Sequence, residues 1–182
     1  MKKTIIGLSV LAGVFALLSA FLPARLPAEQ REAQKLKVYI SVDMEGICGV
    51  VAVEQTTPGN PEYVAAKKWM ADDANAAIDG AFRAGASEVV VNDSHGSQRN
   101  IDPGDLNPKA VLISGAPKPQ SMMQGIDGTY DAVLFVGYHA GAGTQDAVLD
   151  HTISSGVVQS IKVNGIELPE LGLNAAIAGA YG

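Results

Sequence analysis

Three short apolar runs in this chain each end at polar side chains of the kinds that bind metal ions. The runs are residues 38–42, 89–91 and 132–136. The polar residues that follow them are Asp43, Glu45, His95 and His139. Short runs rich in β-branched residues and bounded by turn formers predict buried parallel strands. Because ligands in open α/β sheets lie at the carboxyl ends of the strands, we expect the four side chains to meet at one edge of a sheet.

Between the first two runs the pattern changes from strand to helix. Asn60, Pro61 and Glu62 supply an N-cap, a proline at the first helical position and an early acid, which together predict a helix start. Apolar residues then recur every three or four positions, at Met70, Ala74, Ala77, Ile78, Ala81 and Phe82. Gly85 is placed to end this helix before the second strand. Strand, helix and strand in this order predict a right-handed βαβ unit.

The last third of the chain contains shorter elements. Residues 111–113 predict a short strand, and residues 119–125 predict one or two helical turns. Asn164 and Gly165 separate residues 157–163 from residues 166–168, and this pair suits a type I′ turn, so we predict a β-hairpin. The predicted fold class is α/β, with a mainly parallel sheet flanked by helices and a β-hairpin insertion.

The final helix has an unusual composition. It opens at Pro169 and Glu170 and is apolar on nearly every side, so we expect it to be buried on several sides. No later segment of the printed sequence would cover it. We therefore expect the domain of residues 37–182 to be incomplete at its C-terminal end, or to depend on a partner.

The first residues indicate export from the cytoplasm. Lys2 and Lys3 precede an apolar stretch at residues 5–22, which predicts a signal peptide over residues 1–28. The stretch is at the lower limit of length for a membrane span, so an uncleaved N-terminal anchor is an alternative. Residues 29–36 would then form a polar linker. We expect a periplasmic or cell-envelope protein without stable membrane contact after cleavage.

Charge and cysteine content narrow the possible partners. Residues 1–28 carry three basic residues and no acid, so their removal changes the net charge from −6 to −9. An acidic surface disfavours nucleic acid and anionic lipid. The single cysteine, Cys48, cannot form an internal disulfide, and we expect it to be a small buried residue beside the site rather than a ligand or nucleophile.

Each candidate ligand also has an ordinary structural interpretation. Asp43 could stabilise a turn, Glu45 could be a surface acid, and His95 and His139 could be hydrogen-bonded histidines of the core. However, two of the three histidines in the chain follow apolar strands on the same side as the Asp-x-Glu pair. In an extended segment both acids of that pair would leave the same face. Because mixed carboxylate and imidazole sets favour zinc, the sequence predicts a metal site, for two ions.

Two further residues are ambiguous on sequence alone. His151 lies outside the strand-end pattern, so it could be a group beside the ligands or a catalytic group. Glu170 heads the last helix, where an acid also complements the helix dipole.

Five strings in the chain, taken in order, resemble the zinc D-aminopeptidase family. The strings are SVDMEGI, VNDSHG, LISGAPKP, FVGYHA and, after the hairpin, ELGLNA. The resemblance covers Lys37 to Tyr181. It implies two zinc ions per subunit, a catalytic role for His151 and a ring-shaped homo-oligomer, a decamer. The metal ligands that it implies are Asp43, Glu45, His95, His139 and Glu170.

Two features depart from the family. Its chains continue well past the helix that begins at Glu170, and its typical enzyme is cytoplasmic, whereas this chain has an export signal.

The predicted function is that of an exported two-metal aminopeptidase. Its substrate would be a short peptide with a free N-terminus, such as a D-Ala peptide of the cell wall. Asp43 would bridge the two ions, which would activate a shared water, and His151 would stabilise the oxyanion or pass a proton to the leaving amine. One alternative is another dinuclear amidase, esterase or phosphoesterase, although no Arg or Lys cluster for phosphate is visible. The other is a noncatalytic metal-binding envelope protein, which would have no use for His151.

Overall fold

The computed structural model describes residues 35–182, and the predicted signal peptide and most of the predicted linker lie outside the described residues. Within residues 35–182, no helix is both long enough and apolar enough to cross a membrane. The main elements are β1 (Leu36–Val42), α2 (Val53–Thr56), α3 (Pro61–Arg83), β2 (Ala86–Asp93), β3 (Val111–Ile113), the 3-10 helix η3 (Ser121–Met123), β4 (Ala132–Val136), β5 (Lys162–Val163), β6 (Ile166–Glu167) and α4 (Glu170–Tyr181).

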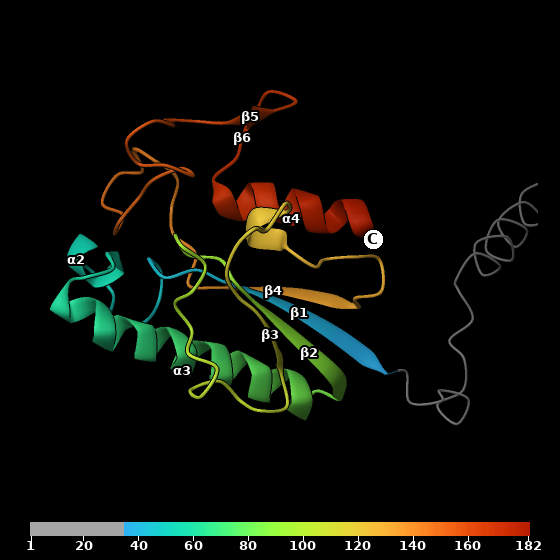
Figure 1. Cartoon of the computed structure of the whole chain (residues 1–182). Coiled ribbons are helices and arrows are strands. Elements are labelled where there is room, and N and C mark those ends of the chain that lie inside the picture. The colour runs from blue at the N-terminus through green and yellow to red at the C-terminus, as the bar shows by residue number, and fades with distance from the viewer. Residues whose placement is uncertain (1–34) are drawn as a thin grey trace, which may run out of the picture. The chain divides into compact units, whose positions relative to one another are not determined.

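A four-stranded sheet in the order β3-β2-β1-β4 forms the centre of the molecule, and all of its strand pairs are parallel (Figure 1). The sheet confirms the predicted α/β class. At its carboxyl edge Val42 of β1 lies opposite Asp93 of β2 and Val136 of β4. The segments that follow these three strands therefore leave the sheet side by side.

Helix α3 covers one face of the sheet (Figure 1). Val38, Ile40 and Val42 of β1 point to this face, and the α3 residues buried against the sheet include Met70, Ala74, Ile78 and Ala81. Both predicted boundaries of α3 are confirmed: Asn60 is the N-cap, and Gly85 follows the helix end with a φ of 100°, which a residue with a side chain rarely adopts.

The other face of the sheet lies under η3 and α4. Tyr39 and Val90 are buried there with Met123 and Ile126, and Ala178 of α4 packs against them. Within α4 the buried residues are Glu170 and Asn174 alone. Leu171 and Ile177 are each 39% exposed, so residues 35–182 cover this apolar helix on one side only, as expected for a domain that is incomplete at its C-terminal end or depends on a partner.

Three local predictions differ from the structure. Helix α2 was not predicted; it is held by Gln55, whose Oε1 accepts hydrogen bonds from the backbone N–H groups of Val51 and Ala52. The predicted hairpin exists with a positive φ at both Asn164 and Gly165, as a type I′ turn needs, but its strands β5 and β6 have only two residues each. Cys48 is exposed, so the prediction that it is buried is wrong.

Candidate metal centre

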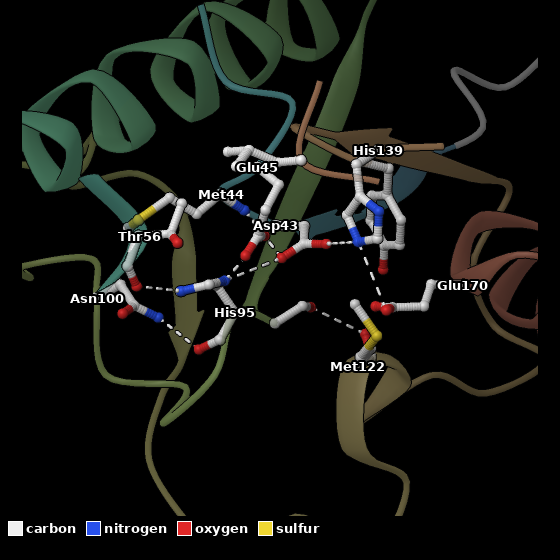
Figure 2. A network of polar contacts seen from close by, with 12 residues as sticks. Asp43, Met44, Glu45, Thr56, His95, Asn100, Met122, His139 and Glu170 are labelled. Carbon is white, nitrogen blue, oxygen red and sulfur yellow. Dashed lines mark hydrogen bonds and ion pairs between the residues drawn. The ribbon is translucent and has the colours of Figure 1, made fainter. Parts of the chain in front are cut away.

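All six residues singled out from the sequence lie together at the carboxyl edge of the sheet. Figure 2 shows Asp43 between His95 on one side and His139 with Glu170 on the other. The loops after β1, β2 and β4 supply Asp43, Glu45, His95 and His139, and the first residue of α4 supplies Glu170.

The segment after β1 turns, although the sequence predicted an extended chain here. The backbone N–H of Met44 donates to Asp43 Oδ1 at 2.9 Å, and that of Ile47 donates to the Met44 carbonyl at 3.1 Å. The turn still directs both acids to one point, because Glu45 Oε2 and Asp43 Oδ1 lie 3.0 and 3.4 Å from the same nitrogen of His95.

Two glycines allow the loops after β1 and β4 to touch. The Gly46 N–H donates to the Gly137 carbonyl at 2.7 Å. A Cβ on Gly46 would lie 2.1 Å from the Tyr138 carbonyl oxygen, and a Cβ on Gly137 would lie 2.2 Å from that of Asp43. Because these neighbours are backbone atoms that cannot swing aside, only glycine permits the contact that brings Asp43 close to His139.

His95 forms one half of the site. Its Nε2 lies 2.9 Å from the Thr56 carbonyl oxygen, which can only accept, so this nitrogen carries a hydrogen. In the neutral ring Nδ1 then has a free lone pair, and it faces Glu45 and Asp43 Oδ1.

His139 forms the other half of the site. Here Nδ1 is the nitrogen that bonds a backbone carbonyl, and Nε2 is the one that faces the carboxylates. Its Nδ1 donates to the Ala140 carbonyl at 2.8 Å. Its Nε2 lies 3.5 Å from both Asp43 Oδ2 and Glu170 Oε1. Among the described residues, Asp43 Oδ2 and His139 Nε2 are buried without a hydrogen-bond partner. Asp43 thus presents one oxygen to each half of the site.

His151 joins the site although its sequence position gave no strand-end signal. Its ring stacks on that of His139, with centroids 3.8 Å apart and planes 11° apart. Its Nδ1 donates to the Leu149 carbonyl at 3.0 Å, and its Nε2 lies 3.5 Å from Glu170 Oε1. The His151 side chain is 20% exposed and that of His139 only 1%, so His151 is the histidine of this pair that a substrate can reach.

Two sets of donor atoms, neither of which includes His95, lie close enough together to hold a metal ion. The two sets each offer three atoms within 4.8 Å of one another: Asp43, Glu45 and His139, and His139, His151 and Glu170. A pocket of about 210 Å³ opens beside them. Its lining includes residues that the sequence did not single out, namely Ser94, Gly96, Gln98, Ser121, Met122 and Ile153. Gln98 and Ser121 have positive φ angles, a feature that their residue types do not signal.

Comparison with known proteins establishes the family. A family profile described as D-aminopeptidase matches residues 36–182. The chain belongs to the D-aminopeptidase family. A D-aminopeptidase of Bacillus subtilis (strain 168) is 43% identical over 146 residues, which are 80% of this chain and 53% of that protein. This family member therefore spans about half the length of its curated relative.

A solved structure agrees with this assignment. It is described as the Zn-dependent D-aminopeptidase DppA from Bacillus subtilis, a self-compartmentalizing protease, and it matches with a TM-score of 0.78 at 43% identity, over 80% of this chain and 53% of that chain. The family resemblance and the α/β fold predicted from the sequence are both confirmed.

The carboxylates and the histidine rings of the candidate metal centre stabilise each other's charges. Burial raises the pKa of Asp43 to about 6, and the charges of Glu45 and Glu170 act in the same direction, whereas the hydrogen bond with His95 lowers it. Burial lowers the pKa of His95, but its hydrogen bonds to Asp43 and Glu45 outweigh burial and raise this pKa to about 10. The pKa of His139 rises to about 9 against burial, through Glu170 and Asp43. The buried carboxylates therefore strongly favour positive charge between them.

Proposed function

We propose that residues 37–182 form the metal-binding and catalytic part of a zinc-dependent D-aminopeptidase, which removes the N-terminal residue from short peptides. The observation that carries the proposal is the carboxylate of Asp43, which offers one oxygen to each of two imidazole and carboxylate groups. Family membership and the match to a Zn-dependent relative support zinc as the metal.

The donors fit zinc in two respects: their chemical type, and the hydrogen bonds that two of them leave unmade. Zinc favours imidazole nitrogen and carboxylate oxygen, and both kinds are present here. Three buried side-chain atoms of the described residues have no hydrogen-bond partner, and two of them, Asp43 Oδ2 and His139 Nε2, are among the donors. A cation between these two atoms would satisfy both.

We assign the donors to two ions. Asp43 would bridge them, Glu45 and His95 Nδ1 would complete one position, and His139 Nε2 and Glu170 would complete the other. The Thr56 and Ala140 carbonyls hold the second ring nitrogen of each histidine and so fix which nitrogen binds metal. Glu170 is oriented by the Ile153 N–H, which donates to its Oε1 at 2.5 Å.

When bound, the zinc ions would polarise the scissile carbonyl and lower the pKa of a water molecule. The proton chemistry then belongs to His151. Because its Nδ1–H is held by the Leu149 carbonyl, the neutral ring presents Nε2 beside the pocket, where it would take the proton that the attacking water gives up. Glu170, 3.5 Å away, stabilises the protonated ring, which then donates its proton to the leaving amine.

The pocket lining bears on the class of substrate. The described residues that line the pocket include no lysine or arginine to hold a phosphate group. This composition favours an aminopeptidase over a phosphoesterase.

The finer parts of the proposal rest on the sequence and on the relative. The charged and apolar start of the chain supports a signal peptide over residues 1–28 and an exported enzyme acting on D-Ala peptides of the cell envelope. The relative described as self-compartmentalizing supports a homo-oligomer, and we keep the decamer as part of the proposal.

A substrate panel tests the proposed function. Purified protein is assayed on D- and L-aminoacyl amides, aminoacyl esters and p-nitrophenyl phosphate, before and after treatment with a chelator. We expect hydrolysis of D-aminoacyl amides that the chelator abolishes and zinc restores. Undiminished hydrolysis by metal-free protein, or hydrolysis of the phosphate ester alone, would refute the proposal.

A further inference from the structure

A buried polar network lies beneath the candidate metal centre, on the sheet face that η3 and α4 cover. Its side chains are Ser41, Ser94, Tyr138 and Asn174. Ser41 and Ser94 are fully or almost fully buried, and Asn174 is 6% exposed.

Each member of this network lies close in sequence to a proposed metal ligand. Ser41 is two residues before Asp43, and Ser94 directly precedes His95. In the same way Tyr138 directly precedes His139, and Asn174 lies about one helical turn after Glu170. The network therefore joins the same four chain segments that supply the ligands.

The contacts run without a gap from α4 to the sheet. Asn174 Nδ2 donates to the Tyr138 hydroxyl at 3.1 Å and lies 3.2 Å from Met122 Sδ. The Tyr138 hydroxyl lies 2.8 Å from Ser41 Oγ, which in turn lies 2.6 Å from Ser94 Oγ and 2.7 Å from the Met122 carbonyl oxygen.

The number of hydrogens on each side chain indicates which group donates in each of these contacts. The Tyr138 hydroxyl accepts from Asn174, so its single hydrogen is free to donate to Ser41. Ser41 then donates onward, to the Met122 carbonyl or to Ser94. Without the Tyr138 hydroxyl, Asn174 would lose its oxygen acceptor and Ser41 would lose a donor, both in a buried space where unmade hydrogen bonds are costly.

Apart from the hydrogen bond that Glu170 accepts from the Ile153 N–H, few contacts of the described residues fix the start of helix α4. Its buried residues are Glu170 and Asn174, and the apolar residue of α4 that packs into the core is Ala178, two turns further on. The Tyr181 hydroxyl accepts a hydrogen bond from Gln120 at the far end of the helix, where Tyr181 is exposed and Gln120 is half-buried.

We propose that Tyr138 and Asn174 are positioning residues that hold the start of α4 so that Glu170 meets His139. Through this role they set the affinity of the metal position that Glu170 and His139 share. The inference rests on the proposed function, because it assumes that these two residues bind zinc.

The test compares two tyrosines whose hydroxyl groups are hydrogen-bonded within the protein, Tyr138 and Tyr39. Tyr138→Phe removes the hydroxyl of the network. Tyr39→Phe is the matched control, because the Tyr39 hydroxyl is also hydrogen-bonded within the protein but lies outside the network, where it donates to the backbone carbonyl of Gln124 at 2.9 Å. Zinc affinity of the full chain is measured by competition with a chelating dye, alongside the melting temperature. We expect Tyr138→Phe to weaken one zinc equivalent about tenfold or more, and Tyr39→Phe to leave zinc binding unchanged even if it melts lower.

The outcomes separate the two proposals because wild-type protein is titrated first. Wild-type protein that binds no zinc would refute the proposed function and the inference with it. Wild-type zinc binding together with equal zinc affinities in Tyr138→Phe and Tyr39→Phe would overturn the inference alone. If Tyr138→Phe does not fold, Asn174→Ala decides by the same measurement, with the same expected loss.

Discussion

At the scale of single residues, three backbone carbonyls prepare the site. Thr56, Ala140 and Leu149 each accept a hydrogen bond from one ring nitrogen of a histidine, which leaves the other nitrogen facing carboxylates. The sequence could place His95 and His139 because they follow strands, and the family resemblance implied His151. It could not reveal which nitrogen is free, since that depends on carbonyls of α2 and of irregular loops.

The different surroundings of His151 and His139 predict different losses on substitution. His151→Ala should keep its zinc while its turnover falls by about 10² to 10⁴, the range for loss of a general acid or oxyanion donor. His139→Ala should lose mainly one zinc ion. Elemental analysis and steady-state kinetics of both variants check this. Near wild-type turnover in His151→Ala would assign that residue a structural role.

The raised histidine pKa values predict how zinc stabilisation depends on pH. In metal-free protein the charged rings of His95 and His139 add stability that is complete below their ordinary pKa of 6.5 and is lost as the pH rises through about 10 and about 9. The buried Asp43 carboxyl, whose pKa is raised from 3.8 to about 6, also makes the metal-free protein less stable as the pH rises, but at lower pH, between about 4 and 6. Zinc needs unprotonated rings, so its stabilising effect must grow over the window given for the two histidines.

Thermal melts with and without zinc, at pH 6.5 and at increasing pH toward 9, measure this dependence. We expect the increase in melting temperature caused by zinc to be larger at the higher pH. An increase that shrinks with pH would contradict the assignment of His95 and His139 as ligands.

At the scale of elements, the contact between the loops after β1 and β4 is the most constrained part of the site. Gly46→Ala places a methyl group against the Tyr138 carbonyl, so we expect a loss of at least about 1 to 3 kcal/mol in unfolding free energy and weaker zinc binding. Gly80→Ala is the matched control: Gly80 lies within α3, and a Cβ there meets nothing within 4 Å. Denaturant unfolding should show Gly80→Ala to be at least as stable as wild type, because alanine favours helix. Equal stability of Gly46→Ala and wild type would contradict the predicted clash.

Most elements were predictable because each carries a local pattern. The strands show as β-branched runs, and α3 shows as an apolar stripe between Asn60 and Gly85. Helix α2 was missed because it spans only Val53–Thr56 and depends on hydrogen bonds that Gln55 Oε1 accepts from the backbone N–H groups of Val51 and Ala52. The turn after Val42 was missed because Asp43 caps the next backbone N–H, a contact that strand periodicity does not indicate.

At the scale of the whole molecule, the sheet brings distant segments to one point. The parallel order β3-β2-β1-β4 sets β1 between β2 and β4, so His95 and His139 approach Asp43 from opposite sides. The sequence predicted the convergence through the general rule for strand ends. It gave no basis for placing His151 on top of His139, because the loop of residues 140–153 has no regular pattern.

The central claim is that Asp43 bridges two zinc ions, and the zinc content of Asp43→Ala tests it most directly. Wild-type protein and the variant are purified with excess zinc, dialysed and analysed for metal per folded chain. We predict two zinc ions in wild type and neither in Asp43→Ala, because both proposed positions would share the Asp43 carboxylate, which lies close to His95 and to His139. An Asp43→Ala variant that is folded and holds as much zinc as wild type would contradict the account.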